Sequence, residues 1–285
     1  MKKMQMAEFT VNMLDPKEEK DVESVILGEM YRRKASMERI AFPGGTRVHS
    51  GWDVFTSVPA AEDAMERMPV EQVPNLTNQW VSSLDTLILH EPDYFEYHYL
   101  AGRVLSVALD IIAPATVRGR MGGGDESQSD HFERYMNHFF PKAEEYLRTA
   151  ILLFERFAQD KDEEVMLHGN RMELALASTL RSRAMYKLNA TQDIEEEKEH
   201  VIEMAQESIL TYLRILRTGF FENEAAAAGV LTNLANALKL VPTPDSVFRG
   251  LIYYNQAKKI LGPIPQIVEG TRWFMLAASR YEKEE

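Results

Sequence analysis

Cysteine is absent from the 285 residues of this chain, and long apolar runs are absent as well. Without cysteine the chain has no disulfide, no thiol nucleophile and no cysteine ligand for zinc or an iron–sulfur cluster. The longest apolar runs, such as 151–154, are far shorter than the ~20 residues of a membrane-spanning helix. Lys2, Lys3 and Glu8 leave no room for the apolar core of a signal peptide at the N-terminus. We therefore expect a cytoplasmic protein with no membrane insertion.

Basic residues are fewer than acidic ones: the chain has 32 Lys and Arg and 44 Asp and Glu, which gives a formal net charge of −12 and a pI near 5.2. Because an acidic chain repels phosphate groups, we do not expect a general binder of nucleic acid or of an anionic membrane. The apolar content of 45% is sufficient for a chain of this length to bury a core without disulfides or metals.

Strand patterns are nearly absent, because no β-branched alternation is bounded by hairpin turns. Helical periodicity is strong instead, with apolar residues at spacings of three and four in 80–88, 143–154, 201–216 and 231–238. Glycines and prolines lie mainly between such stretches and are expected to end helices; among them are Pro92, Pro114, Pro141, Gly219, Pro244 and Gly262. The pattern predicts an all-α fold.

Residues 1–75 differ from the rest of the chain. A helix is predicted from about Pro16 to Ile40, and the stretch 42–74 then contains four prolines and little periodicity apart from a short helix at 60–68. We expect 1–75 to form an N-terminal helix with an extended arm. Residues 76–285 are expected to form a helical repeat domain, with a mobile insert at about 115–130 that carries Gly122, Gly123 and Gly124.

Four helical stretches share a Leu-Ala pair preceded by a bulky residue three positions before the leucine. These are Tyr97 with Leu100-Ala101, Arg171 with Leu174-Ala175, Leu231 with Leu234-Ala235, and Trp273 with Leu276-Ala277. Partner stretches between them carry a small residue, a larger one four positions later and another three further on. These are Ala143, Leu147 and Ala150; Ala205, Ile209 and Tyr212; and Gly250, Tyr254 and Ala257. Small residues at fixed positions let antiparallel helices approach closely.

This alternation resembles the tetratricopeptide repeat, whose first helix carries W-x-x-L-G/A and whose second carries A-x-x-x-F/Y-x-x-A before a proline. The resemblance covers roughly residues 77–281. The alanines of the four pairs are 74, 60 and 42 residues apart, whereas the family repeats at about 34. The resemblance implies a TPR-like α-solenoid of antiparallel helix pairs, whose concave face binds an extended peptide or a partner helix. An irregular helical bundle with chance matches is the alternative.

The resemblance also implies which residues bind the partner, because the first helix of each pair lines the groove at positions two before and two or five after the leucine. Those positions are His98, Met172, Thr179, Thr232, Asn236, Lys239, Phe274 and Tyr281. Ordinary solvent-facing helix residues are the alternative interpretation. Family members that capture a peptide's terminal carboxylate use several lysines and arginines. Only Asn233, Asn236 and Lys239 match that pattern here.

Catalytic and metal-binding patterns are weak. His131 and His138 are seven residues apart, which is about 10 Å of rise along a helix and too far for one ion. His90, Glu91, Asp93, Glu96 and His98 offer ligand types, but Pro92 lies where a turn is needed. His49, Ser50 and Asp53 lack the flanks of a nucleophile elbow. We expect no catalytic residues, no metal site and no cofactor.

The sequence therefore predicts a non-enzymatic protein–protein interaction module, working as an adaptor, assembly factor or chaperone on a protein or peptide partner, with self-association into a homo-oligomer left open. The alternative from another class is a small-ligand-binding helical-repeat accessory component of a solute transporter. A helical-bundle enzyme with a metal at residues 90–98 ranks third.

Overall fold

The computed structural model describes residues 65–118, 126–157, 163–190, 194–241 and 243–284. This described part of the chain is all-helical and contains no strand, as the periodicity predicts. The predicted helix at 16–40 and most of the predicted arm lie outside the described residues, and so do Gly122, Gly123 and Gly124.

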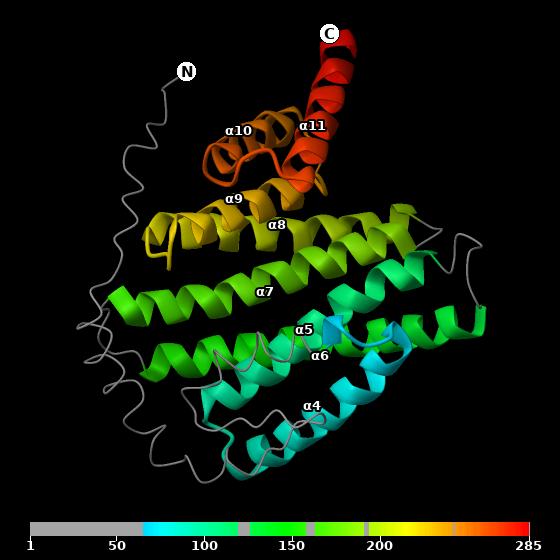
Figure 1. Cartoon of the computed structure of the whole chain (residues 1–285), viewed down its shortest axis with the longest axis vertical. Helices are drawn as coiled ribbons and strands as arrows, with labels where there is room; N and C mark the ends of the chain where they lie inside the picture. The colour runs from blue at the N-terminus through cyan, green and yellow to red at the C-terminus, as the bar shows by residue number, and fades with distance from the viewer. Residues whose placement is uncertain (1–64, 119–125, 158–162, 191–193, 242, 285) are drawn as a thin grey trace.

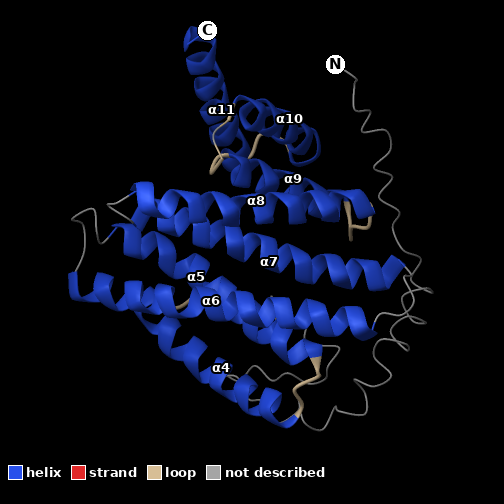
Figure 2. Cartoon of the chain, turned by 180° about the vertical axis from the view of Figure 1, so that it is seen from behind, coloured by secondary structure: helices blue, strands red, loops and turns tan. Residues whose placement is uncertain are grey.

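The helices follow one another in a stack, in chain order from α4 to α11 (Figure 1). The view from behind shows the same order (Figure 2). A short 3-10 turn, η1 (Val70–Gln72), precedes α4. The helices are α4 (Val73–His90), α5 (Phe95–Arg118), α6 (Glu126–Phe157), α7 (Glu163–Ala190), α8 (Ile194–Thr218), α9 (Glu224–Leu238), α10 (Pro244–Leu261) and α11 (Pro265–Glu284).

Local capping fixes the ends of several helices. Asn223 begins α9, and its side chain accepts a hydrogen bond from the Ala226 N–H at 2.9 Å. Thr243 does the same for α10, at 3.2 Å from the Ser246 N–H, with Pro244 at the first position of the helix. Gly262 ends α10 with a φ of 74°, a conformation that favours glycine.

Two prolines lie inside helices, so the prediction that they end helices is wrong. Pro114 lies in α5 and Pro141 in α6. A proline in a helix interior loses a hydrogen bond at a cost of ~3 kcal/mol. The contact between α5 and α6 is the most extensive in the described fold and offsets that loss. Because both helices continue through their prolines, they occupy much of the predicted insert at 115–130.

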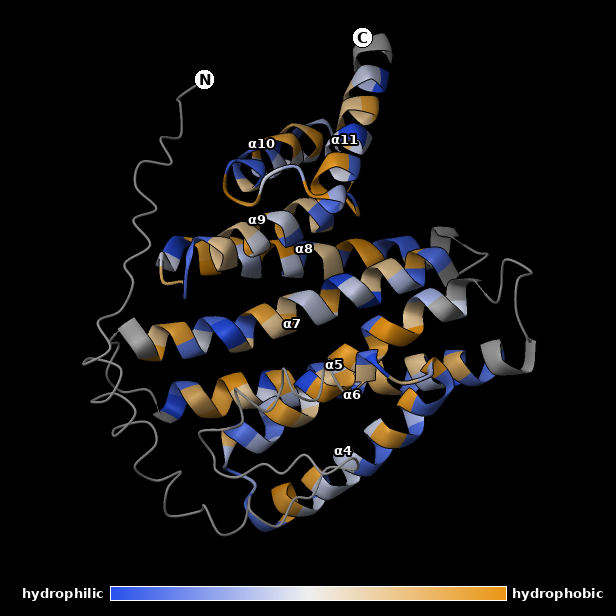
Figure 3. Cartoon of the chain, in the orientation of Figure 1, coloured by the Kyte–Doolittle hydropathy of each residue, from blue (hydrophilic) through white to orange (hydrophobic). Residues whose placement is uncertain are grey.

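Each helix packs against the next along the chain, and the most extensive contacts are those of α5 with α6, α7 with α8, and α9 with α10. Some helices that are two apart in the chain are also in contact: α5 contacts α7, α7 contacts α9, and α9 contacts α11. Apolar residues alternate with polar ones along each helix (Figure 3). The buried ones form two clusters, one centred on α4 to α7 and the other on α7 to α11. Both clusters include residues of α7 and α8, so these two helices contribute to both parts of the core.

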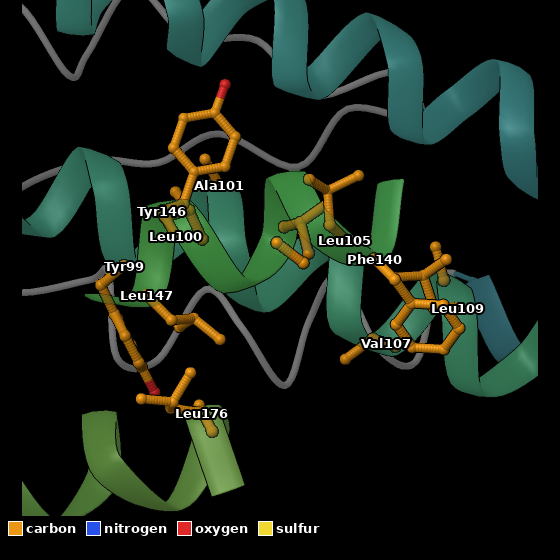
Figure 4. Packing of buried hydrophobic residues seen from close by; sticks show 14 of the residues in the cluster. Tyr99, Leu100, Ala101, Leu105, Val107, Leu109, Phe140, Tyr146, Leu147 and Leu176 are labelled. Carbon is orange, nitrogen blue, oxygen red and sulfur yellow. The ribbon is translucent and has the colours of Figure 1, made fainter. Parts of the chain in front are cut away.

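Small residues allow α5 and α6 to approach closely. A Cβ atom at Gly102 would lie 2.7 Å from Cγ of Leu147 and 3.1 Å from the carbonyl oxygen of Ala143. Ala101 and Ala143 are fully buried in the same contact. Figure 4 shows Leu100 and Ala101 of α5 beside Leu147 of α6. The small residues that the sequence analysis singled out in these helices thus lie in the core.

A network of ion pairs joins α6, α7 and α8 at the surface. The Glu144 carboxylate accepts from Nη1 of Arg183 at 2.7 Å and from Nη2 of Arg148 at 2.8 Å. Arg148 also donates to Oε1 of Glu207 at 2.7 Å. The carboxylates of Glu207 and Glu144 raise the pKa of Arg148 above its ordinary value, and partial burial opposes them. The network links three helices through charge as well as packing.

Substituting Glu144→Gln is expected to destabilise the fold by about 1–2 kcal/mol, because Arg183 loses its carboxylate. Both side chains are only 18% exposed, so water compensates the lost pair poorly. Urea unfolding measures the effect. The matched control is Asp245→Asn, which removes an exposed pair with Arg249 within one helix and should cost less than ~0.5 kcal/mol. Equal losses in the two variants would contradict this account.

Candidate partner-binding site

The structure divides the eight residues that the sequence analysis assigned to partner binding into two groups. Five side chains are buried, with 0–8% of their surface exposed: His98, Met172, Thr179, Thr232 and Phe274. The other three, Asn236, Lys239 and Tyr281, are partly exposed. A partner can therefore reach the second group in this structure, and the first group offers it little surface.

The buried polar residues are engaged inside the fold. Thr179 lies where α7 meets α5, and its hydroxyl is 2.6 Å from that of Ser106. Thr232 donates to the carbonyl oxygen of Ala228 at 2.9 Å. A ring nitrogen of His98 lies 2.8 Å from the carbonyl oxygen of Pro92. The spacing rule predicted that Thr179 lines an open groove, but the contact between α5 and α7 covers the face of α7 on which Thr179 lies.

The three exposed candidates are not all in one place. Asn236 and Lys239 are neighbours near the end of α9, where Nζ of Lys239 donates to Oδ1 of Asn236 at 2.9 Å. The hydroxyl of Tyr254 in α10 donates to the same oxygen at 2.6 Å. Nζ of Lys239 also lies 5.2 Å from the centre of the Tyr254 ring and 5.9 Å from that of Phe274. Tyr281 packs partly against the second buried cluster from α11.

Arg181 of α7 joins this group, although the sequence analysis did not select it. Its Nη1 donates to Oδ1 of Asn233 in α9 at 2.5 Å. Its Nε is buried and makes no hydrogen bond within the described residues. Arg181 lies seven residues after Leu174, two positions beyond the last one that the spacing rule covered. Seven residues are about two helical turns, so adding the position seven after the leucine to the rule would have found it. We call Arg181, Asn233, Asn236, Lys239 and Tyr254 the Arg181–Lys239 cluster.

The cluster carries positive charge that the described residues do not neutralise. Burial lowers the pKa of Lys239 below its ordinary value, the positive charge of Arg181 lowers it further, and Glu269 opposes the shift. Burial raises the pKa of Tyr254 to about 12, against the effect of Arg181. Within the described ranges neither cation forms an ion pair with a carboxylate.

Substituting Lys239→Met is expected to leave stability at neutral pH unchanged or higher, because the depressed pKa means that burying the charge costs free energy. Between that pKa and the ordinary value of 10.5 the unfolded chain binds more protons than the folded one. Parent stability therefore rises with pH through this window, and the variant should lose that rise. Thermal unfolding across the window measures it, with exposed Lys258→Met as control. A large loss of stability in the variant at neutral pH would contradict this account.

The remaining candidates for the described part of the chain are a metal site and a membrane-spanning helix. No three His, Asp or Glu side chains there are grouped to hold a metal ion. His98, one of the ligand types noted at 90–98, is engaged with Pro92. No helix within the described ranges is both long and apolar enough to cross a membrane.

Comparison of the chain with protein-family models, with curated proteins and with solved structures finds no significant match. The resemblance to the tetratricopeptide repeat therefore rests on the residues of this chain alone.

Proposed function

We propose that this chain is a non-enzymatic protein-interaction module, an adaptor, assembly factor or chaperone, that binds a carboxylate of a partner protein at the Arg181–Lys239 cluster. The observation that carries the proposal is the convergence of Arg181 from α7 and Lys239, the residue that follows the end of α9. Both are partly buried, and neither has a carboxylate partner in the described structure.

The unused hydrogen-bonding groups of the cluster are donors. Oδ1 of Asn233 accepts from Arg181, and Oδ1 of Asn236 accepts from Lys239 and Tyr254. The amide nitrogens of the two asparagines donate no hydrogen bond within the described residues. Nε of Arg181 donates none either, but it is buried, so a partner would meet the other guanidinium nitrogens first. Donors without acceptors beside two cations suit an anion that accepts several hydrogen bonds, and a carboxylate is the commonest such group on a protein.

The packing supports the proposed architecture, a TPR-like solenoid of antiparallel pairs. In such a solenoid α5/α6, α7/α8 and α9/α10 are the pairs, and first helices contact one another along one face. The contacts of α5 with α7, α7 with α9 and α9 with α11 fit this arrangement. Leu100 and Leu234 of the Leu-Ala pairs are fully buried, whereas Leu276 in the last helix is 57% exposed. Arg181, Asn233 and Asn236 of the cluster lie on two of the proposed first helices, α7 and α9, while Lys239 directly follows α9 and Tyr254 lies on α10.

Selection from a synthetic random-peptide library tests the proposal, with the library offered once with free carboxyl termini and once as carboxamides. The full chain should enrich peptides that carry a carboxylate, at the terminus or in Asp and Glu side chains. The variant Arg181→Glu/Lys239→Glu should enrich none of them. Enrichment of uncharged peptides, or enrichment that survives the charge reversal, would overturn the proposal.

A further inference from the structure

A cavity of about 430 Å³ lies among α6, α7 and α8 and shares no residue with the Arg181–Lys239 cluster. Its size falls in the range of small-molecule sites, ~300–1,000 Å³. Its apolar walls are Ile151, Phe154, Val165, Met166 and Met172. Met172, which the sequence analysis assigned to partner binding, thus contributes to an internal wall.

A glycine keeps space open in this cavity. Gly169 lies in α7 among the lining residues, and a Cβ atom there would be 3.4 Å from the ring of Phe154. That distance is ordinary van der Waals contact, so a small addition fits, while a longer side chain must enter the cavity. The rings and chains of Phe154, Val165 and Met172 are almost fully buried and form a fixed apolar surface.

The polar side of the cavity carries more negative than positive charge. Glu173 of α7 accepts a hydrogen bond from Nε of Arg214 in α8 at 2.9 Å. Glu155 of α6 is also a lining residue, so two carboxylates face one guanidinium. Asn170 is already used, because its amide donates to Thr218 at 2.6 Å and to the carbonyl oxygen of Phe220 at 2.9 Å.

The Glu173 carboxylate is incompletely compensated. Its side chain is 17% exposed, whereas that of Arg214 is 61% exposed and shared with water. Burial raises the pKa of Glu173 above its ordinary value, the pair with Arg214 opposes this, and the charge of Glu155 adds to it. A second positive charge beside Glu173 would therefore stabilise its ionised form.

We propose that this cavity binds a small organic cation with an apolar body. The charged nitrogen lies beside Glu173, and the apolar body lies against Phe154 and the partly exposed Met166. A neutral ligand leaves the excess negative charge unbalanced, and an anion is repelled by Glu155 and Glu173. This site does not depend on the proposed partner binding.

Isothermal titration of the full chain with three probes that share a phenylethyl body tests the proposal. The probes are phenethylammonium, 2-phenylethanol and 3-phenylpropanoate, which carry a positive, a neutral and a negative head. The ammonium is expected to bind saturably at millimolar concentration or below, and at least ~10-fold more tightly than the other two. Equal affinity of the three probes, or no saturable binding of the ammonium, would overturn the proposal.

Two variants place the binding in the cavity. Gly169→Leu fills the space beside Phe154 and should abolish binding, while Gly229→Leu is the matched control, because a Cβ at Gly229 meets nothing within 4 Å. Glu173→Gln keeps the shape and should weaken the ammonium about tenfold. In the parent, affinity should fall as the pH drops through the raised pKa of Glu173, with Glu155 and Arg214 the other charges facing it. Binding that survives Gly169→Leu would place the probe elsewhere and overturn the assignment.

Discussion

Substituting Gly250→Leu is expected to destabilise the fold by about 3 kcal/mol, and Gly250→Ala by about 1–3 kcal/mol. A Cβ atom at Gly250 in α10 would lie 2.1 Å from Cζ of Phe274 in α11, far inside van der Waals contact. The Phe274 ring is fully buried, so it has no free space into which to move. Gly270 of α11 faces the Tyr254 ring in the same way, with a closest distance of 2.2 Å. Each helix thus receives an aromatic ring of the other over a glycine.

The matched control for Gly250→Ala is Gly229→Ala in α9, where a Cβ meets nothing within 4 Å. There the gain in helix propensity should stabilise the fold by up to ~1 kcal/mol. Urea unfolding followed by circular dichroism gives both values. The two glycine-to-alanine changes should therefore have opposite signs, and a neutral or stabilising Gly250→Ala would contradict the packing described for α10 and α11.

Substituting Phe274→Ala is expected to cost about 3–5 kcal/mol, because it empties a fully buried site between α10 and α11. The adjacent Met275 is 61% exposed, so Met275→Ala should change the free energy of unfolding by less than ~0.5 kcal/mol. In the double variant Gly250→Ala/Phe274→Ala the losses should be less than additive, because the added methyl group then has room. A small change in the free energy of unfolding on Phe274→Ala would contradict its burial and would favour the groove-lining position that its spacing predicted.

The fold was largely accessible from the sequence, because the periodic stripes that predict helices are also the stripes that pack. Trp80, Val81 and Leu84 are buried in α4, and Leu231, Leu234 and Leu238 are buried in α9. The ends of α9 and α10 follow from local signals, such as the Asn223 and Thr243 caps. Such patterns involve neighbouring residues only, so no tertiary information is needed to find them.

Pro114 and Pro141 show that local sequence rules for helix ends can fail, because both prolines lie inside helices. Their helix-ending preference of ~3 kcal/mol is smaller than what two long helices gain by packing along their length. No local pattern reports how extensive the contact between α5 and α6 becomes. The prediction of an irregular insert therefore extended too far into both helices.

The candidate site was accessible only in part. Asn236 and Lys239 were selected because they lie at fixed spacings from Leu234 within one helix. Arg181 is 58 residues away from Lys239 in the sequence, and only the packing of α7 against α9 brings the two charges together. The burial of Phe274 could not be predicted for a related reason, because Gly250, on another helix, makes the space that its ring fills.

The most direct test of the proposed function is a fluorescence-polarisation titration of a labelled free-carboxylate peptide from the library selection. The intact chain is compared with Arg181→Glu/Lys239→Glu and with Lys258→Glu/Lys259→Glu, a control at two exposed lysines of α10. Both double variants lower the net charge of −12 by the same four units. We expect a loss of about 100-fold or more in the first variant and less than about threefold in the control. Equal losses in the two variants would show that overall charge governs binding and would contradict a carboxylate site at the Arg181–Lys239 cluster.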